Sequence, residues 1–145
     1  MADISQNSVT IEAPVAEVQA LLSDLAGYPA WSTAIKSVDV LESDGQSRPT
    51  KVKIAIDAGV MKDRVTLDYD WSKAPSEISF SLDDADLLTE MTGAYIISDN
   101  GDDTTTVTSQ LTVALSMPVP AMMRTKAERS TIDLALNQMK QKLEG

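Results

Sequence analysis

The stretch RVTLDYDW, residues 64–71, alternates polar and apolar side chains without interruption. Because successive side chains of a β-strand point to opposite faces, Val65, Leu67, Tyr69 and Trp71 share one face. Charged side chains and one threonine occupy the other face. The pattern predicts a strand with one face in the core and one in solvent, which is typical of an antiparallel sheet.

The same alternation returns in six other segments, at residues 8–13, 35–43, 48–57, 77–83, 87–98 and 107–115. Turn-forming residues separate them at 44–46, 58–59, 73–76, 83–86 and 99–103. Connections this short favour an antiparallel meander over strand-helix-strand units. Counting in twos places these further side chains on the inner face: Ile54, Ile56, Phe80, Val107, Ser109 and Leu111.

Two helical regions flank this series of strands. Residues 14–25 carry apolar side chains at three- and four-residue spacing, with Pro14 in the first turn and Gly27 just beyond the end. A second, short helical turn opens at Pro29 and contains Trp31. The long amphipathic segment 120–143 would form a helix of roughly 35 Å, long enough to cross several strands.

These elements predict one α+β domain spanning residues 1–145, in which the C-terminal helix covers the apolar face of a seven-stranded sheet. We expect an apolar cavity between sheet and helix. On the helix, one stripe at 3.6-residue periodicity contains Met122, Arg129, Ile132 and Leu136. The neighbouring Met123 also begins the helix, where flexible thioethers adapt to ligands of varied shape or simply fill gaps.

Composition limits the chemistry. The chain has no cysteine and no histidine, which removes thiolate nucleophiles, disulfides and the commonest metal ligand and proton shuttle. Two acidic clusters lack the spacing of a calcium loop and are better explained as solvated turns. The sequence therefore predicts no metal and no other cofactor. The clusters are Asp83, Asp84 and Asp86, and Asp99, Asp102 and Asp103.

The net charge of −10 argues against a nucleic-acid partner or an anionic membrane, because such binding depends on lysine and arginine. No run of about 18 apolar residues is present, and the N-terminal residues do not resemble a secretory signal. We expect a soluble cytoplasmic protein without stable membrane insertion. Nothing in the sequence identifies a protein partner.

Several local motifs occur in the order of a known superfamily. They are Tyr28-Pro29-Ala30-Trp31 after the first helix, Gly93-Ala94-Tyr95 in a late strand, and Met117-Pro118-Val119-Pro120 before a helix that contains Lys126-Ala127-Glu128-Arg129. Nearly the whole chain resembles the START-like superfamily, which includes polyketide cyclases and dehydrases, coenzyme Q-binding proteins and the birch-pollen allergen fold. The motif before the last helix is similar to small actinobacterial members. This resemblance implies a helix-grip fold, in which a curved sheet wraps around the C-terminal helix.

The resemblance also bears on the strand at residues 87–98. A slip of one residue would turn Glu90 inward and Tyr95 outward. We expect Met91, Gly93 and Tyr95 to face inward, because this register keeps the family-like glycine and tyrosine together.

The predicted ligand contacts come from the inner face and the helix. Tyr69 and Tyr95 have polar tips that orient a ligand or bond to backbone, and Trp71 is favoured as core. Arg129 either pairs with a ligand acid group or with Asp133, four residues on. The full set is Ile54, Ile56, Val65, Leu67, Tyr69, Trp71, Phe80, Met91, Tyr95, Val107, Ser109, Leu111, Met122, Met123, Arg129, Ile132 and Leu136.

Three functions remain open at this point. The first is non-catalytic binding, transport or sequestration of a hydrophobic small molecule such as a lipid, quinone or polyketide. The resemblance makes a polyketide aromatase/cyclase or dehydratase the second, with Tyr69, Glu90 and Tyr95 as weak candidates for proton transfer. The third is a protein-interaction module with a closed core.

Overall fold

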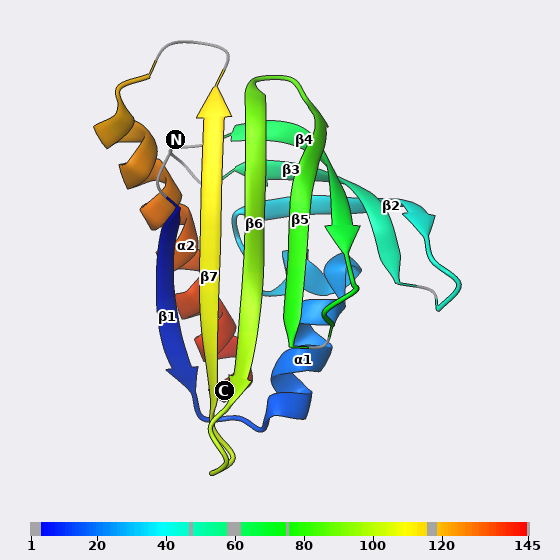
Figure 1. Ribbon diagram of the computed structural model, residues 1–145, viewed down its shortest axis with the longest axis vertical. Helices are drawn as coiled ribbons and strands as arrows, with labels where there is room; N and C mark the ends of the chain where they lie inside the picture. The colour runs from blue at the N-terminus through cyan, green and yellow to red at the C-terminus, as the bar shows by residue number, and fades with distance from the viewer. Residues whose placement is uncertain (1–3, 47, 58–61, 75, 116–118, 145) are drawn as a thin grey trace.

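The computed structural model describes residues 4–46, 48–57, 62–74, 76–115 and 119–144 (Figure 1). The chain forms β1 (Ser5–Ile11), α1 (Val15–Ser23), the 3-10 helix η1 (Leu25–Ala30), β2 (Ile35–Ser43), β3 (Pro49–Asp57), β4 (Lys62–Asp70), β5 (Glu77–Ala85), β6 (Leu88–Asp99), β7 (Thr105–Leu115) and α2 (Ala121–Glu144). The predicted break at 58–59 lies outside the described residues, as do Met117 and Pro118 of the motif before α2.

The seven strands form one antiparallel sheet in the order β1-β7-β6-β5-β4-β3-β2. Strands β2 to β4 bend across the end of the sheet at a steep angle to β5, β6 and β7 (Figure 1). Helix α2 lies against β1 and β7, at the other side of this curved sheet. The predicted α+β class and helix-grip architecture are therefore confirmed.

The first helix is shorter than predicted. Asp24 takes the non-helical angles φ −89° and ψ 81°, so α1 ends at Ser23 and the 3-10 helix begins at Leu25. Pro29 lies inside this 3-10 helix instead of opening a turn, and Trp31 follows its end. The backbone N–H of Trp31 donates to Tyr28 O over 3.1 Å.

Several strands extend beyond a predicted end, including β1 and β5. Strand β1 begins at Ser5, because its pairing with β7 extends to Leu111. Strand β5 continues to Ala85, where Asp84 and Ala85 still pair with β4. Acidic side chains that were expected in a turn therefore stand on a strand.

A buried glutamate fixes α2 to the sheet. Glu128 is only 1% exposed, and its carboxylate accepts hydrogen bonds from Ser5 Oγ and from the backbone N–H of Val113, both at 2.7 Å. Strand β1 begins at Ser5, opposite Leu111, so it does not extend to Val113. The Glu128 carboxylate therefore accepts the N–H of Val113 where β1 offers no carbonyl. A buried N–H without an acceptor would cost free energy.

Further along, α2 and β1 remain side by side. Asn7 Nδ2 donates to Asp133 Oδ1 over 2.9 Å, and Lys140 Nζ donates to Thr10 O over 2.7 Å. On its opposite side, α2 reaches the segment before β2 through a reciprocal pair. Thr33 N–H donates to Gln138 Oε1 over 3.0 Å, and Gln138 Nε2 donates to Thr33 Oγ1 over 2.7 Å.

A second buried carboxylate shapes the turn between β5 and β6. Asp63 is 9% exposed and accepts the backbone N–H groups of Asp86, Leu87 and Leu88 at 3.2, 3.1 and 2.8 Å. These bonds attach the turn to β4. Within the described ranges, no helix is both long and apolar enough to cross a lipid bilayer.

We predict that Glu128→Ala lowers the free energy of unfolding by about 3 kcal/mol, because two buried donors lose a charged acceptor. Urea unfolding followed by circular dichroism measures the change. The control is Glu17→Ala on the exposed face of α1, which should change stability by less than about 0.5 kcal/mol. Equal effects in the two variants would contradict the role given to Glu128.

Candidate functional site

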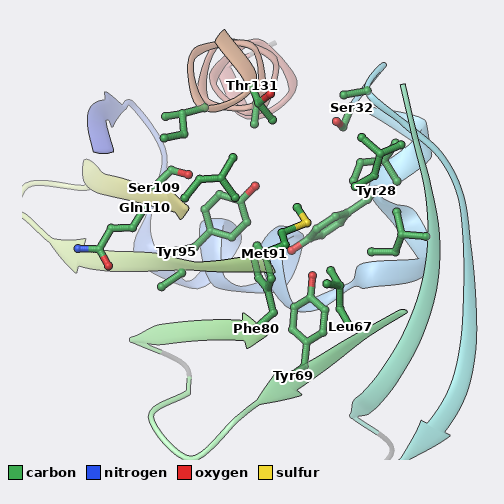
Figure 2. Close-up of a pocket in the computed structure, with 18 of the residues that line it drawn as sticks. Tyr28, Ser32, Leu67, Tyr69, Phe80, Met91, Tyr95, Ser109, Gln110 and Thr131 are labelled. Atoms are coloured by element: carbon green, nitrogen blue, oxygen red, sulfur yellow. The ribbon is translucent and has the colours of Figure 1, made fainter. Parts of the chain in front are cut away.

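A cavity of about 80 Å³ lies between the concave face of the sheet, η1 with the segment after it, and α2. Figure 2 shows it with α2 above, and with Tyr69 and Tyr95 directed into the space below the helix. Its walls are mostly apolar. The lining residues are Tyr28, Trp31, Ser32, Ala34, Ile35, Ile54, Ile56, Leu67, Tyr69, Phe80, Met91, Ala94, Tyr95, Ser109, Gln110, Leu111, Thr131, Ile132 and Ala135.

Alternation along the strands accounts for most of the lining from the sheet. Each strand from β3 to β7 sends its inner set toward α2, as counting in twos predicted. Ten predicted residues are brought together around the cavity. They are Ile54, Ile56, Leu67, Tyr69, Phe80, Met91, Tyr95, Ser109, Leu111 and Ile132.

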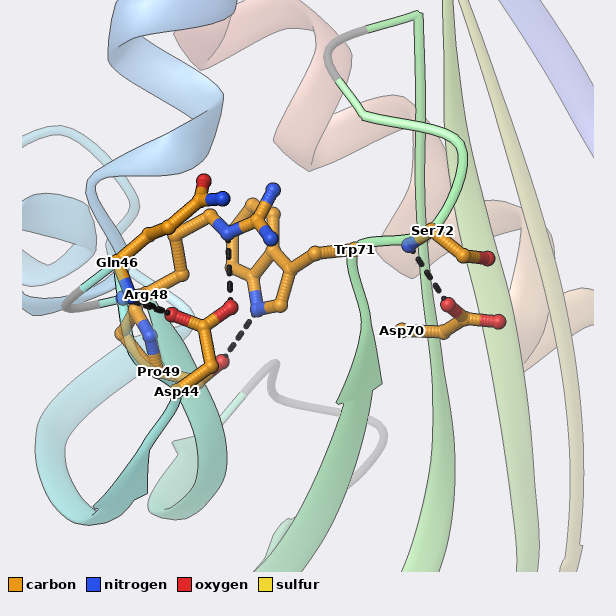
Figure 3. A network of polar contacts seen from close by, with 7 residues as sticks. All are labelled: Asp44, Gln46, Arg48, Pro49, Asp70, Trp71 and Ser72. Carbon is orange, nitrogen blue, oxygen red and sulfur yellow. Dashed lines mark hydrogen bonds and ion pairs between the residues drawn. The ribbon is translucent and has the colours of Figure 1, made fainter.

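Four other predicted residues are buried without lining the cavity. Val65 and Val107 are fully buried and Leu136 is 2% exposed, all within the hydrophobic core. Trp71 follows the end of β4, where its indole N–H donates to Pro49 O (Figure 3). The guanidinium of Arg48 lies 5.9 Å from the centre of the Trp71 ring, so this indole packs against the turn of the β2–β3 hairpin.

Three residues of α2 were wrongly predicted to face inward. Met122 and Met123 are 83% and 62% exposed, and Arg129 is also exposed. The buried stripe of the helix runs instead through Glu128, Ile132, Leu136 and Met139. A buried glutamate replaces the arginine in the apolar stripe, whereas Ile132 and Leu136 are buried as predicted, so the prediction fails only at the start of the helix.

The alternative proposed for Arg129 is not seen either. Its predicted partner Asp133 accepts a hydrogen bond from Asn7, and the structure shows no ion pair between the side chains of residues 129 and 133. An acid-binding role for Arg129 in the cavity is therefore overturned.

The register expected for β6 is confirmed. Met91 and Ile97 are buried and Tyr95 lines the cavity, whereas Glu90 is exposed on the outer face. The prediction of Glu90 as a catalytic candidate is therefore wrong, because its carboxylate lies outside the cavity.

Gly93 allows the Phe80 ring to lie against the backbone of β6. The two residues pair across β5 and β6, and a Cβ atom at position 93 would stand 2.5 Å from Phe80 Cζ and 2.8 Å from Gln110 O. Only glycine leaves room for this approach. The glycine therefore sets how far the Phe80 ring projects into the cavity.

The polar groups of the cavity are mainly hydroxyls, and they include the indole N–H of Trp31, which is buried without a hydrogen-bond partner among the described residues. Among the described residues, the hydroxyls of Ser32, Tyr69, Tyr95 and Ser109 have no hydrogen-bond partner. The Tyr28 hydroxyl differs, because it donates to Leu22 O. A hydroxyl both donates and accepts, so four of these groups remain free for a bound molecule.

These hydroxyls are uncharged at neutral pH. Burial raises the pKa of Tyr95 to about 12. Burial, with the neighbouring Tyr95, raises the pKa of Tyr69 further, and the pKa of Tyr28 is also raised, chiefly by burial. A tyrosinate base at neutral pH is excluded by these shifts.

The part of the chain that the structure describes brings no group of three or more acidic side chains into metal-binding proximity. Asp83 pairs with Lys51, whose Nζ lies 3.2 Å from the Asp83 carboxylate. Asp99 accepts the backbone N–H of Gly101, and Asp102 accepts that of Thr104. The second cluster therefore includes carboxylates that stabilise their own turn, as expected for acidic turns.

Sequence reasoning missed nine lining residues. Tyr28 and Trp31 are both buried, with ring centres 5.2 Å apart, and they also line the cavity. Their motif after the first helix is the signal that pointed to this corner. The others, for which the sequence offered no clear signal, are Ser32, Ala34, Ile35, Ala94, Gln110, Thr131 and Ala135.

Comparison with known proteins supports the same relationship. Residues 2–144 match the family model described as polyketide cyclase/dehydrase and lipid transport. No curated protein matches the sequence significantly.

Three solved structures show the same fold at low sequence identity. A START superfamily protein from Mycobacterium smegmatis has a TM-score of 0.91 and 21% identity, covering 97% of both chains. A protein from Thermus thermophilus has a TM-score of 0.81 and 19% identity, also covering 97% of both chains. The Zhui aromatase/cyclase from a Streptomyces species has a TM-score of 0.80 and 18% identity, covering 98% of this chain and 93% of its own.

We predict that the protein loses stability steeply in alkali. An unfolded tyrosine ionises near pH 10, whereas the buried ones stay protonated to about pH 12 or above. The raised pKa values therefore contribute stability that is complete below about pH 10 and is lost as the pH rises through the folded pKa. Each protonated tyrosine adds a slope of about 1.4 kcal/mol per pH unit in this window.

Urea unfolding between pH 9 and 11.5 measures this slope, and absorbance at 295 nm follows tyrosine ionisation. The control is Tyr95→Phe, whose slope should be smaller by about 1.4 kcal/mol per pH unit. Ionisation of all three tyrosines near pH 10 in the folded protein would contradict their burial in an uncharged cavity.

Proposed function

The chain belongs to the polyketide cyclase/dehydrase and lipid transport family, and on this basis we propose that it binds a neutral, largely apolar small molecule in the cavity below α2. The observation that carries the proposal is the combination of apolar walls with four free hydroxyls and no lining side chain that is charged at neutral pH. Removing apolar ligand surface from water drives binding, and the hydroxyls orient the ligand's oxygen atoms.

The same lining argues for a neutral ligand. A carboxylate or phosphate would lose its hydration and meet no cation, because Arg129 is outside the cavity. A carbonyl or phenol oxygen needs only a hydroxyl partner. Quinones and neutral polyketides fit this description better than free fatty acids.

The volume of the cavity sets a second condition on the ligand. A cavity of about 150 Å³ accommodates benzene, whereas this one has about 80 Å³. A quinone or polyketide therefore requires the cavity to widen. Helix α2 is fixed to the sheet along β1 by Glu128, Asp133 and Lys140, so we place the widening on its other side, at the Thr33–Gln138 pair.

The aromatase/cyclase alternative draws support from the family and from the fold shared with the Zhui enzyme. Its difficulty is proton transfer. Tyr69 and Tyr95 stay protonated at neutral pH, so they donate hydrogen bonds to a carbonyl but do not act as bases, and Glu90 is exposed. Turnover of a polyketide substrate that disappears in Tyr69→Phe would favour this alternative.

The third possibility, an interaction module with a closed core, is favoured by the small cavity volume. It predicts no uptake of apolar molecules. The cytoplasmic location remains a prediction from composition.

We predict that menadione, a neutral quinone, quenches tryptophan fluorescence saturably, because Trp31 lines the cavity. At pH 7, 1-naphthoate should bind at least about tenfold more weakly, since its carboxylate has no partner there. Tyr95→Phe should weaken menadione binding about fivefold without loss of stability. Tyr28→Phe is the matched control, because its hydroxyl is already bonded to Leu22 O.

In that control we expect stability to fall by about 1 kcal/mol while menadione affinity is retained. Failure of menadione and of neutral apolar dyes such as Nile red to bind would refute the proposed function. Equal binding of menadione and 1-naphthoate would refute the neutral-ligand condition alone.

We also predict that Gln138→Ala accelerates menadione association, because it removes both hydrogen bonds that join α2 to Thr33. Stopped-flow fluorescence measures the association rate constant. The matched control is Gln6→Ala, whose exposed side chain accepts a hydrogen bond from Gln110 and does not line the cavity. An unchanged rate in Gln138→Ala would place the opening elsewhere.

A further inference from the structure

The first turns of α2 expose an unusual set of side chains. Met122 and Met123 are 83% and 62% exposed, and they are the two most exposed large apolar side chains of the described residues. Lys126 and Arg129 are exposed on the next turns. We call these four residues, together with Ile4, the α2 corner.

Helix geometry places the four α2 residues together. Residues three and four apart on a helix are neighbours, so Lys126 lies one turn from both Met122 and Met123, and Arg129 lies one turn beyond Lys126. Ile4, 59% exposed, precedes Ser5, which bonds to Glu128 on this same part of α2. In Figure 1 the start of α2 projects at a corner of the molecule, near the start of β1.

The charge of this corner is opposite to that of the whole chain. Residues 121–133 contain three basic side chains, Arg124, Lys126 and Arg129, and two acidic side chains, the buried Glu128 and Asp133, which accepts a hydrogen bond from Asn7. Within the described residues, none of the three cations has an ion-pair partner. The first turn of α2 has no acidic residue, so the positive end of the helix dipole is not neutralised there.

Screening decides whether the net charge of −10 cancels this local excess. At physiological ionic strength the Debye length is about 8 Å, so exposed acidic residues on distant strands contribute little at the α2 corner. The argument from overall charge against an anionic membrane therefore does not apply to this part of the surface.

From exposed apolar side chains flanked by cations on a projecting corner, we propose that the α2 corner docks on the surface of an anionic phospholipid bilayer. The methionines and Ile4 enter the interfacial region while Lys126 and Arg129 contact lipid phosphates. The helix lies on the membrane and does not span it. A projecting corner suits a deformable bilayer better than a protein partner, which would need a groove to receive it.

Docking of the α2 corner on a membrane also bears on the cavity, although the docking proposal does not depend on the proposed ligand-binding function. Thr131, Ile132 and Ala135 of the same helix line the cavity. A membrane contact through the start of α2 therefore brings the helix that covers the cavity close to the lipid bilayer, in which a neutral apolar ligand concentrates.

The experiment is vesicle flotation of the full chain with phosphatidylcholine vesicles containing 0 or 30% phosphatidylglycerol. We expect binding only to the anionic vesicles, and its loss in 500 mM NaCl. Lys126→Gln with Arg129→Gln should reduce the partition coefficient about 25-fold, at about fivefold for each cation. Met122→Ser with Met123→Ser should reduce it about tenfold or more.

The matched control is Lys36→Gln with Lys53→Gln, two exposed lysines on β2 and β3 that change the net charge equally. Its partition coefficient should stay within twofold of the unaltered protein. Circular dichroism of every variant establishes that the fold is retained, as expected for exposed positions.

Two results would overturn the proposal. One is absence of binding to anionic vesicles. The next partner to test at the α2 corner would then be an acidic protein. The other is an equal loss in the control variant, which would show that net charge and not the α2 corner governs binding. Menadione binding in solution is unaffected by either result, so failure of docking and failure of the proposed function are distinguishable.

Discussion

The structure depends on one requirement, which is that the apolar face of a curved sheet be covered, chiefly by the long helix α2. Strands with alternating side chains leave this face exposed unless α2 lies against it. The helix is held there by burial of Ile132, Leu136 and Met139, and also by the Glu128 carboxylate between β1 and β7. Because Glu128 bonds to groups at the start of β1 and the end of β7, it fixes both the rotation of α2 and its position along the sheet.

The position of α2 in turn decides what the cavity contains. Covering β1 and β7 leaves space between the helix and the strands that bend across from the far side. The groups that reach this space are apolar side chains, uncharged hydroxyls and the indole N–H of Trp31. Neutral hydroxyls with raised pKa values suit recognition of carbonyl and phenol oxygens, and they leave the site without a base at neutral pH.

The rotation of the helix also explains its outer surface. With Glu128 turned inward, Arg129 and the two N-terminal methionines turn outward, where a cavity contact is impossible and contact with a large surface is open. One buried carboxylate thus connects three features of the molecule: the attachment of the helix, the uncharged lining of the cavity and the basic, apolar corner. The family described as polyketide cyclase/dehydrase and lipid transport covers both enzymes and carriers, so these local features, more than the fold, distinguish this chain.

The sequence by itself determined the strands, their inner faces and the covering role of the last helix. Period-two alternation has only two possible assignments, and the apolar residues choose between them, so Ile54, Leu67 and Tyr95 were placed correctly. Which side chains at the start of α2 face the sheet was decided only by the tertiary structure, whereas Ile132 and Leu136 are buried as predicted. One-residue neighbours on a helix differ by 100°, and the pattern favoured Arg129 within a stripe that in fact passes through Glu128. The buried Glu128 is stabilised by Ser5, more than a hundred residues away in the sequence, and by the backbone N–H of Val113 in β7, and no local pattern predicts that juxtaposition. For the same reason Ser32, Thr131 and Ala135 became lining residues only when separate segments met around the cavity.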